Sequence, residues 1–285
     1  MYGQASPRLR PMGIGDILDE VIRQYRRNFR LLIGIGLWPF VLLAVVETVS
    51  NLAQLLSRDS WLTIGMNLLQ VLVMFVVYSL VFMAVTFAAS SAYLGESRTR
   101  SEAWHLGLRR FWASVGLSLL AFLLVFLMAI TIIGIPVAIY FGVCWTLSIQ
   151  AMLFQGLGPW PAMRRSRALV RGSWWRTALI LFLLSVMVGV IQMAFSVPQW
   201  VLIGVAVAIS GPAAALHGGP IFVSASVLSN LIGVVSQLLI LPFSVICMML
   251  LYYDLRVRKE GFDLELRARE MGGVDRPPVD APNGE

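Results

Sequence analysis

Residues 112–159, WASVGLSLLAFLLVFLMAITIIGIPVAIYFGVCWTLSIQAMLFQGLGP, decide the fold because these 48 residues include no Asp, Glu, Lys or Arg. A helix needs roughly 20 mostly apolar residues to cross the hydrocarbon core of a bilayer, where charged side chains are costly. The stretch is therefore long enough for two membrane spans. Gly134 and Pro136 mark a very short turn between them.

Three further stretches have the same character. Residues 31–50 contain one ionisable side chain, Glu47, residues 62–94 contain none, and residues 177–253 contain only the weak base His217. The whole chain is 58% hydrophobic and 13% charged, whereas a soluble domain has about 25% charged residues. The composition therefore indicates an integral membrane protein.

The basic residues fix the predicted topology. Of the 22 Lys and Arg residues, 21 lie in the polar segments 8–30, 98–110, 164–176 and 256–276, and the exception is Arg58. Short segments rich in Lys and Arg stay on the cytoplasmic side of a membrane. Both termini and the two middle segments are thus predicted to be cytoplasmic, which requires two spans between each pair of basic segments. Arg replaces Lys almost throughout, which suggests a bacterial protein of the cytoplasmic (plasma) membrane.

The predicted fold class is all-α: a polytopic membrane protein with six transmembrane helices in three hairpins, each preceded by a cytoplasmic amphipathic helix. The spans are expected at about 31–50, 62–90, 112–132, 136–155, 177–197 and 225–253. Residues 1–30 contain the N-terminal amphipathic helix, with apolar residues at helical spacing. Residues 254–270 are expected to form a charged cytoplasmic helix. Residues 271–285 are rich in Gly, Pro and Asp and are expected to be disordered.

Residues 198–220 allow more than one interpretation. They are apolar but interrupted by Gly211, Pro212, Gly218, Gly219 and Pro220. A seventh span would place the basic C-terminal tail outside the cell. An interfacial or re-entrant segment on the outer side agrees better with the charge rule.

Few residues in the chain offer chemistry. His105 and His217 have no partner at metal-ligand spacing, and no Gly-rich phosphate loop is present in a strand–turn–helix context. No catalytic residue, metal site or cofactor is therefore predicted. Cys144 and Cys247 lie in predicted spans and are interpreted as small core residues. Glu47 is the intramembrane candidate site, because an ionisable residue there is a functional hypothesis by default, although solvation at the outer rim near Arg58 also explains it.

A second candidate site is the basic cluster Arg164, Arg165, Arg167 and Arg171. Arg and Trp side chains next to a span commonly act as interfacial anchors. The alternative is a contact site for anionic lipid headgroups or for a protein partner at the cytoplasmic face. Because the basic residues lie next to the spans, membrane retention accounts for them, and nucleic-acid binding is not expected.

Three segments together suggest a family. They are MGIGDILDE at 12–20, GSWWR at 172–176 and YYDLRVRKEGFDLEL at 252–266. With them the chain resembles the membrane-domain family named after glycerophosphoryl diester phosphodiesterase, over nearly its whole length. The resemblance implies a six-span bacterial membrane protein. In that enzyme the chemistry belongs to a separate soluble barrel domain, so the resemblance gives no catalytic residue, and phosphodiesterase activity is not expected.

The sequence leaves two classes of function open. The first is a non-catalytic membrane scaffold or partner-binding component, which predicts a tightly packed bundle. The alternative is a lipid-handling or small-solute transport protein, which predicts a groove open to the membrane or a polar cavity. An enzyme lacks candidate residues.

Overall fold

The computed structural model describes residues 11–56, 60–95, 100–211 and 219–261, and the regular structure within them is entirely α-helical. The helices are α1 (Ile14–Leu56), α2 (Ser60–Tyr93), α3 (Arg100–Arg109), α4 (Phe111–Ala129), α5 (Gly134–Trp145), α6 (Ser148–Gln155), α7 (Pro159–Val170), α8 (Trp174–Ser210) and α10 (Pro220–Glu260). The all-α prediction is thus confirmed. His217, the predicted tail at 271–285 and most of the predicted helix at 254–270 lie outside the described residues.

Six helical stretches are long and apolar enough to cross a membrane. They are Ile14–Ala53, Trp61–Tyr93, Phe111–Ala129, Gly134–Gln155, Trp174–Ser210 and Pro220–Glu260. Five of them contain one of the stretches that the hydropathy predicts, and Phe111–Ala129 ends three residues before the predicted end of the third span at 132.

Several helix boundaries differ from the sequence prediction. The amphipathic segment and the first span form one continuous helix, α1. No glycine or proline stands at the predicted boundary between Arg30 and Leu31 to end the helix there. Likewise α10 continues from the last span into the charged segment and ends only at Gly261, whose φ of +60° suits a glycine. The predicted fourth span is instead divided into α5 and α6 at Thr146 and Leu147.

Residues 198–210, part of the segment 198–220 that is predicted to be interfacial, re-entrant or a seventh span, do not form a separate helix. These residues continue α8, which passes through Pro198 and ends at Gly211, where φ is +79°. Proline removes one helical hydrogen bond, but its fixed φ is helical, and interior prolines are tolerated in membrane helices. The terminating residue is therefore the glycine.

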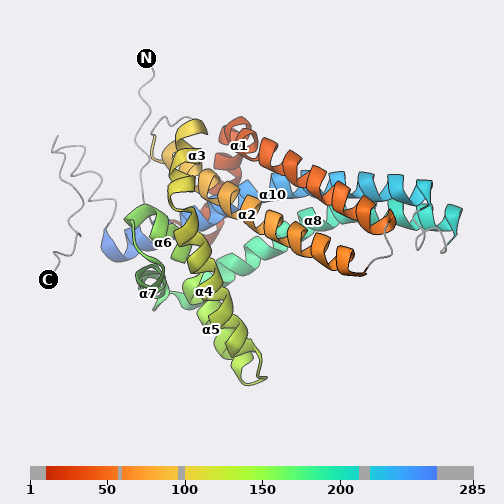
Figure 1. Ribbon diagram of the computed structural model, residues 1–285. Helices are drawn as coiled ribbons and strands as arrows, with labels where there is room; N and C mark the ends of the chain where they lie inside the picture. The colour runs from red at the N-terminus through yellow and green to blue at the C-terminus, as the bar shows by residue number, and fades with distance from the viewer. Residues whose placement is uncertain (1–10, 57–59, 96–99, 212–218, 262–285) are drawn as a thin grey trace, which may run out of the picture.

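Helices α1, α2, α8 and α10 lie side by side, while the α4–α5 hairpin projects away from them in another direction (Figure 1). Helices α3, α6 and α7 lie where the two parts meet. The core is built around the C-terminal half of α10, whose residues from Leu241 to Leu255 are nearly all buried. Gly36 of α1 permits one close approach, because a Cβ atom there would lie 2.8 Å from a methyl carbon of Leu238.

The interruption between α5 and α6 is stabilised by a serine from α7. The Ser166 hydroxyl donates to the Cys144 carbonyl at 2.6 Å and accepts from the Leu147 N–H at 3.2 Å. All three residues are buried. Backbone groups released by a helix break need such partners, since an unpaired buried polar group is costly.

Candidate functional site

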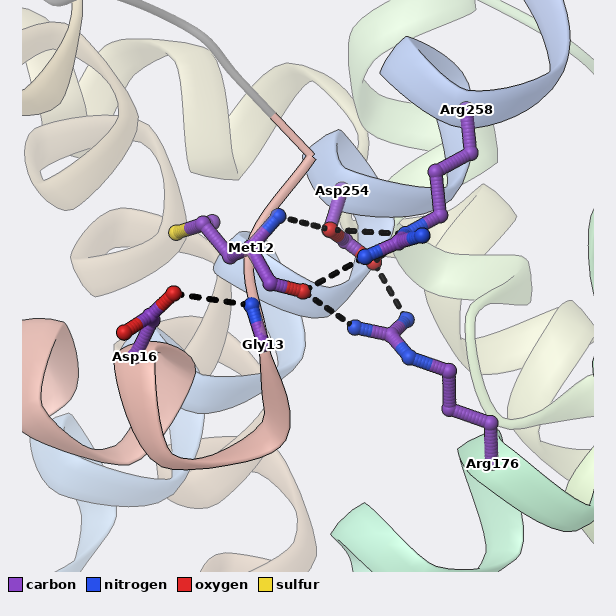
Figure 2. A network of polar contacts seen from close by, with 6 residues as sticks. All are labelled: Met12, Gly13, Asp16, Arg176, Asp254 and Arg258. Atoms are coloured by element: carbon purple, nitrogen blue, oxygen red, sulfur yellow. Dashed lines mark hydrogen bonds and ion pairs between the residues drawn. The ribbon is translucent and has the colours of Figure 1, made fainter.

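A buried carboxylate joins three distant parts of the chain. Asp254 of α10 is 1% exposed, and it accepts hydrogen bonds from the backbone N–H of Met12 (2.8 Å) and from Arg176 of α8 (2.5 Å). Arg258, one turn further along α10, donates to both carboxylate oxygens at 3.1 and 3.2 Å. Figure 2 shows these residues converging, and we call Met12, Arg176, Asp254 and Arg258 the Asp254 cluster.

The carbonyl of Met12 completes the cluster. It accepts from Arg176 at 2.7 Å and from Arg258 at 2.6 Å, so the two guanidinium groups share the same two acceptors. The next residue, Gly13, donates its N–H to Asp16 at 2.9 Å (Figure 2). A carboxylate at the third helical position that bonds back to the preceding N–H is a capping arrangement, and it fixes the start of α1.

The Asp254 cluster is suited to a structural role. Both oxygens of the carboxylate are occupied by donors, and charge-assisted bonds of this kind hold their partners in fixed geometry. In the sequence, Arg176 is one of the basic residues next to a span and Asp254 begins the predicted charged helix, so the cluster was not predicted. The available sign was the i, i+4 spacing of Asp254 and Arg258 directly after an apolar stretch.

The structure separates the four arginines that the sequence groups on α7. Arg165 points to α10, where it forms an ion pair with Glu260 and donates to Gln155 at 3.0 Å. Arg164, Arg167 and Arg171 are exposed. Arg164 and Arg167, three residues apart, lie on one side of α7, and Arg171 caps its C-terminal end. We call these three residues the arginine face of α7.

The arginine face continues into a row of aromatic rings. The guanidinium carbon of Arg167 lies 5.2 Å from the centre of the Phe141 ring, and Phe141 packs edge-on against Tyr140. Tyr140 stacks on Trp174 with ring centres 5.8 Å apart, and the Trp174 indole N–H donates to the Tyr140 carbonyl. These contacts connect α7, α5 and the start of α8.

Beside these rings lies a shallow open groove of about 460 Å³ between α5 and α8, which we call the lateral groove. Its lining is almost entirely apolar. The lining residues are Pro136, Ile139, Tyr140, Trp174 and Trp175. Trp175 is 82% exposed at its rim. A groove of this composition can accept an apolar chain.

The other predicted residues lie apart from this site. Glu47 is half-buried on α1, and its carboxylate is close enough to the hydroxyl of Tyr78 on α2 to interact with it electrostatically. His105 is exposed on α3. Cys144 and Cys247 are buried and unpaired with each other, as expected of core residues. Among the residues that the structure describes, no three His, Cys, Asp or Glu side chains gather as metal ligands would.

The six long apolar helices make this chain a polytopic membrane protein. Comparison with protein-family models, with curated proteins and with solved structures finds no match. The resemblance to the glycerophosphoryl diester phosphodiesterase membrane-domain family therefore stays a prediction. The three segments that suggest it do meet in space, because Met12, Arg176 and Asp254 each come from one of them.

Proposed function

We propose that this protein is a non-catalytic membrane protein that binds phospholipid in the lateral groove. The observation that carries the proposal is the groove itself, an apolar surface that is open to the side. It lies between α5 and α8, which run in different directions (Figure 1). Ligand sites of comparable size, about 300 to 1,000 Å³, are typically apolar with a few polar groups that orient the ligand. Here such a group is the exposed Arg167, whose guanidinium lies over Phe141, next to the lining residue Tyr140.

The proposed topology has six spans in three hairpins, with both termini and the basic segments on the cytoplasmic side of a bacterial plasma membrane. The contacts support a common side for these segments. Asp254 accepts hydrogen bonds from Met12 and Arg176, and Arg258 donates to the Met12 carbonyl. Lys259 donates to the carbonyls of Ala168 and Arg171. The start of α1, the end of α7, the start of α8 and the end of α10 thus lie together.

A photoactivatable lipid tests the proposed function. The purified protein would be reconstituted in vesicles with phosphatidylcholine that carries a diazirine on one acyl chain, and the adducts would be mapped by peptide mass spectrometry. We expect labelling of the peptides around Ile139 and Trp174 that excess unlabelled phospholipid competes away. Ile139→Trp, which fills the groove, should abolish this saturable labelling. Val190→Trp, at an exposed site of α8 outside the groove lining, is the matched control. Labelling that does not saturate at the groove would refute the proposal.

A second candidate is a membrane scaffold that binds a protein partner at the arginine face of α7. It is favoured by the way Arg165 and Lys259 fix α7 against α10 and so hold the exposed arginines in a defined position. Capture of one stoichiometric protein by the wild type, lost in Arg164→Gln/Arg167→Gln, would favour this candidate.

A further inference from the structure

We infer that the arginine face of α7 gives the lateral groove a preference for anionic phospholipids, with Arg167 and Arg171 binding the headgroup phosphate. This inference rests on the proposed function, since it names the headgroup class of the lipid whose acyl chain would occupy the groove.

The first argument is charge complementarity. Helix α7 contains three arginines and no acidic residue, and Arg171 follows directly as its C-terminal cap. Arg165 is neutralised by Glu260, but no carboxylate among the described residues pairs with Arg164, Arg167 or Arg171. Arg171 caps α7 four residues after Arg167, and its N–H donates to the Arg167 carbonyl at 2.9 Å, so two like charges lie one turn apart at the end of the helix. An anion between them would relieve this repulsion and accept hydrogen bonds from both guanidinium groups.

The second argument is continuity between the charged and apolar parts. Arg167 lies over Phe141, Phe141 contacts Tyr140, and Tyr140 stacks on Trp174 in the groove lining. Arg171 precedes Trp174 by three residues, across the turn at Gly172, where φ is +83°. The guanidinium group of Arg167 therefore lies next to rings that continue into the groove lining, and Arg171 is close to that lining in the chain. A phospholipid has the same arrangement, with a phosphate next to its acyl chains.

The third argument is position. The arginine face belongs to a segment that the charge distribution places on the cytoplasmic side, where anionic lipids produce a negative surface potential. Trp174 and Trp175 belong to the residue type that collects at headgroup level. A bound headgroup would thus lie at its normal depth, with no need for the lipid to leave the bilayer.

Native mass spectrometry with defined lipids tests this inference. The delipidated full-length protein in detergent would be titrated with phosphatidylglycerol and with phosphatidylcholine of identical acyl chains. The variants are Arg167→Gln/Arg171→Gln and the control Arg109→Gln, which removes an exposed arginine of α3. We expect phosphatidylglycerol to bind more tightly to the wild type and to the control. The double variant should lose about fivefold in affinity for each arginine, and roughly 25-fold in total, while binding of phosphatidylcholine changes little.

The possible results separate the two claims. If both lipids bind the wild type equally, or if the double variant keeps the preference, the inference is overturned while the proposed function stands. If neither lipid binds the wild type, both fall. Loss of the preference in Arg109→Gln as well would show a general effect of surface charge and would also overturn the assignment to α7.

Discussion

The Asp254 cluster provides the most specific test of how this fold is held together. In Asp254→Asn the side chain keeps its shape, but two guanidinium groups lose their counter-charge inside the protein. Breaking a buried ion pair by removing one partner costs about 3 to 5 kcal/mol. The side chains of Arg176 and Arg258 are 22% and 36% exposed, so they regain some hydration. We therefore expect a loss of about 2 to 3 kcal/mol in the free energy of unfolding, roughly 30- to 150-fold in the equilibrium constant.

The measurement is reversible unfolding of the purified protein in mixed micelles, titrated with SDS and followed by tryptophan fluorescence. The matched control is Asp19→Asn, the same chemical change at an exposed position of α1. Its effect should stay within about 0.5 kcal/mol, as is usual for surface substitutions. If Asp254→Asn unfolds like Asp19→Asn, the buried cluster does not stabilise the fold and the reasoning is wrong.

Three further predictions concern packing and topology. Ser166→Ala removes the partner of the Leu147 N–H at the α5–α6 break and should lower the free energy of unfolding by about 1 to 3 kcal/mol. Ser224→Ala, on the exposed surface of α10, should be nearly neutral in the same SDS titration. Equal effects would contradict a stabilising role of Ser166 at the break. Gly36→Val forces a side chain against Leu238 and should lower the stability of the fold by about 1 to 3 kcal/mol. A Cβ atom at Gly189 meets no atom within 4 Å, so Gly189→Val should not destabilise the protein through such a clash. Thermal melts of the two variants test this difference, and equal melting temperatures would contradict it. An impermeant maleimide should label Ile133→Cys from outside intact cells and Ser101→Cys only after permeabilisation. Background labelling should be low because Cys144 and Cys247 are buried. Failure to label Ile133→Cys from either side would mean that the α4–α5 hairpin ends within the membrane.

Hydropathy predicted the spanning helices because it depends on local composition alone. The stretch that follows Phe111 and the one that ends at Tyr93 are apolar whatever their neighbours are. Helix ends were predicted less well, because a proline or a charged residue permits a stop without requiring it. Pro198 lies inside α8, and α1 continues past Arg30 without a break.

The candidate site could be predicted only in part. The sequence singled out the arginines of α7 but could not show that Arg165 pairs with Glu260, which is 95 residues away, while Arg167 stays exposed over Phe141. The lateral groove arises from the placement of α5 against α8, and neither helix carries a local mark of it. Ser166 is a further case, since a serine on an amphipathic helix gives no sign of bonding to a distant helix break.

The most direct test of the proposed function is native mass spectrometry of the protein purified from its own membranes with the bound lipids retained. The account predicts one phospholipid per chain that survives detergent exchange, is enriched in anionic headgroups and is lost in Ile139→Trp. A protein that carries no lipid beyond the exchangeable annulus, or that keeps its lipid when the groove is filled, would contradict it.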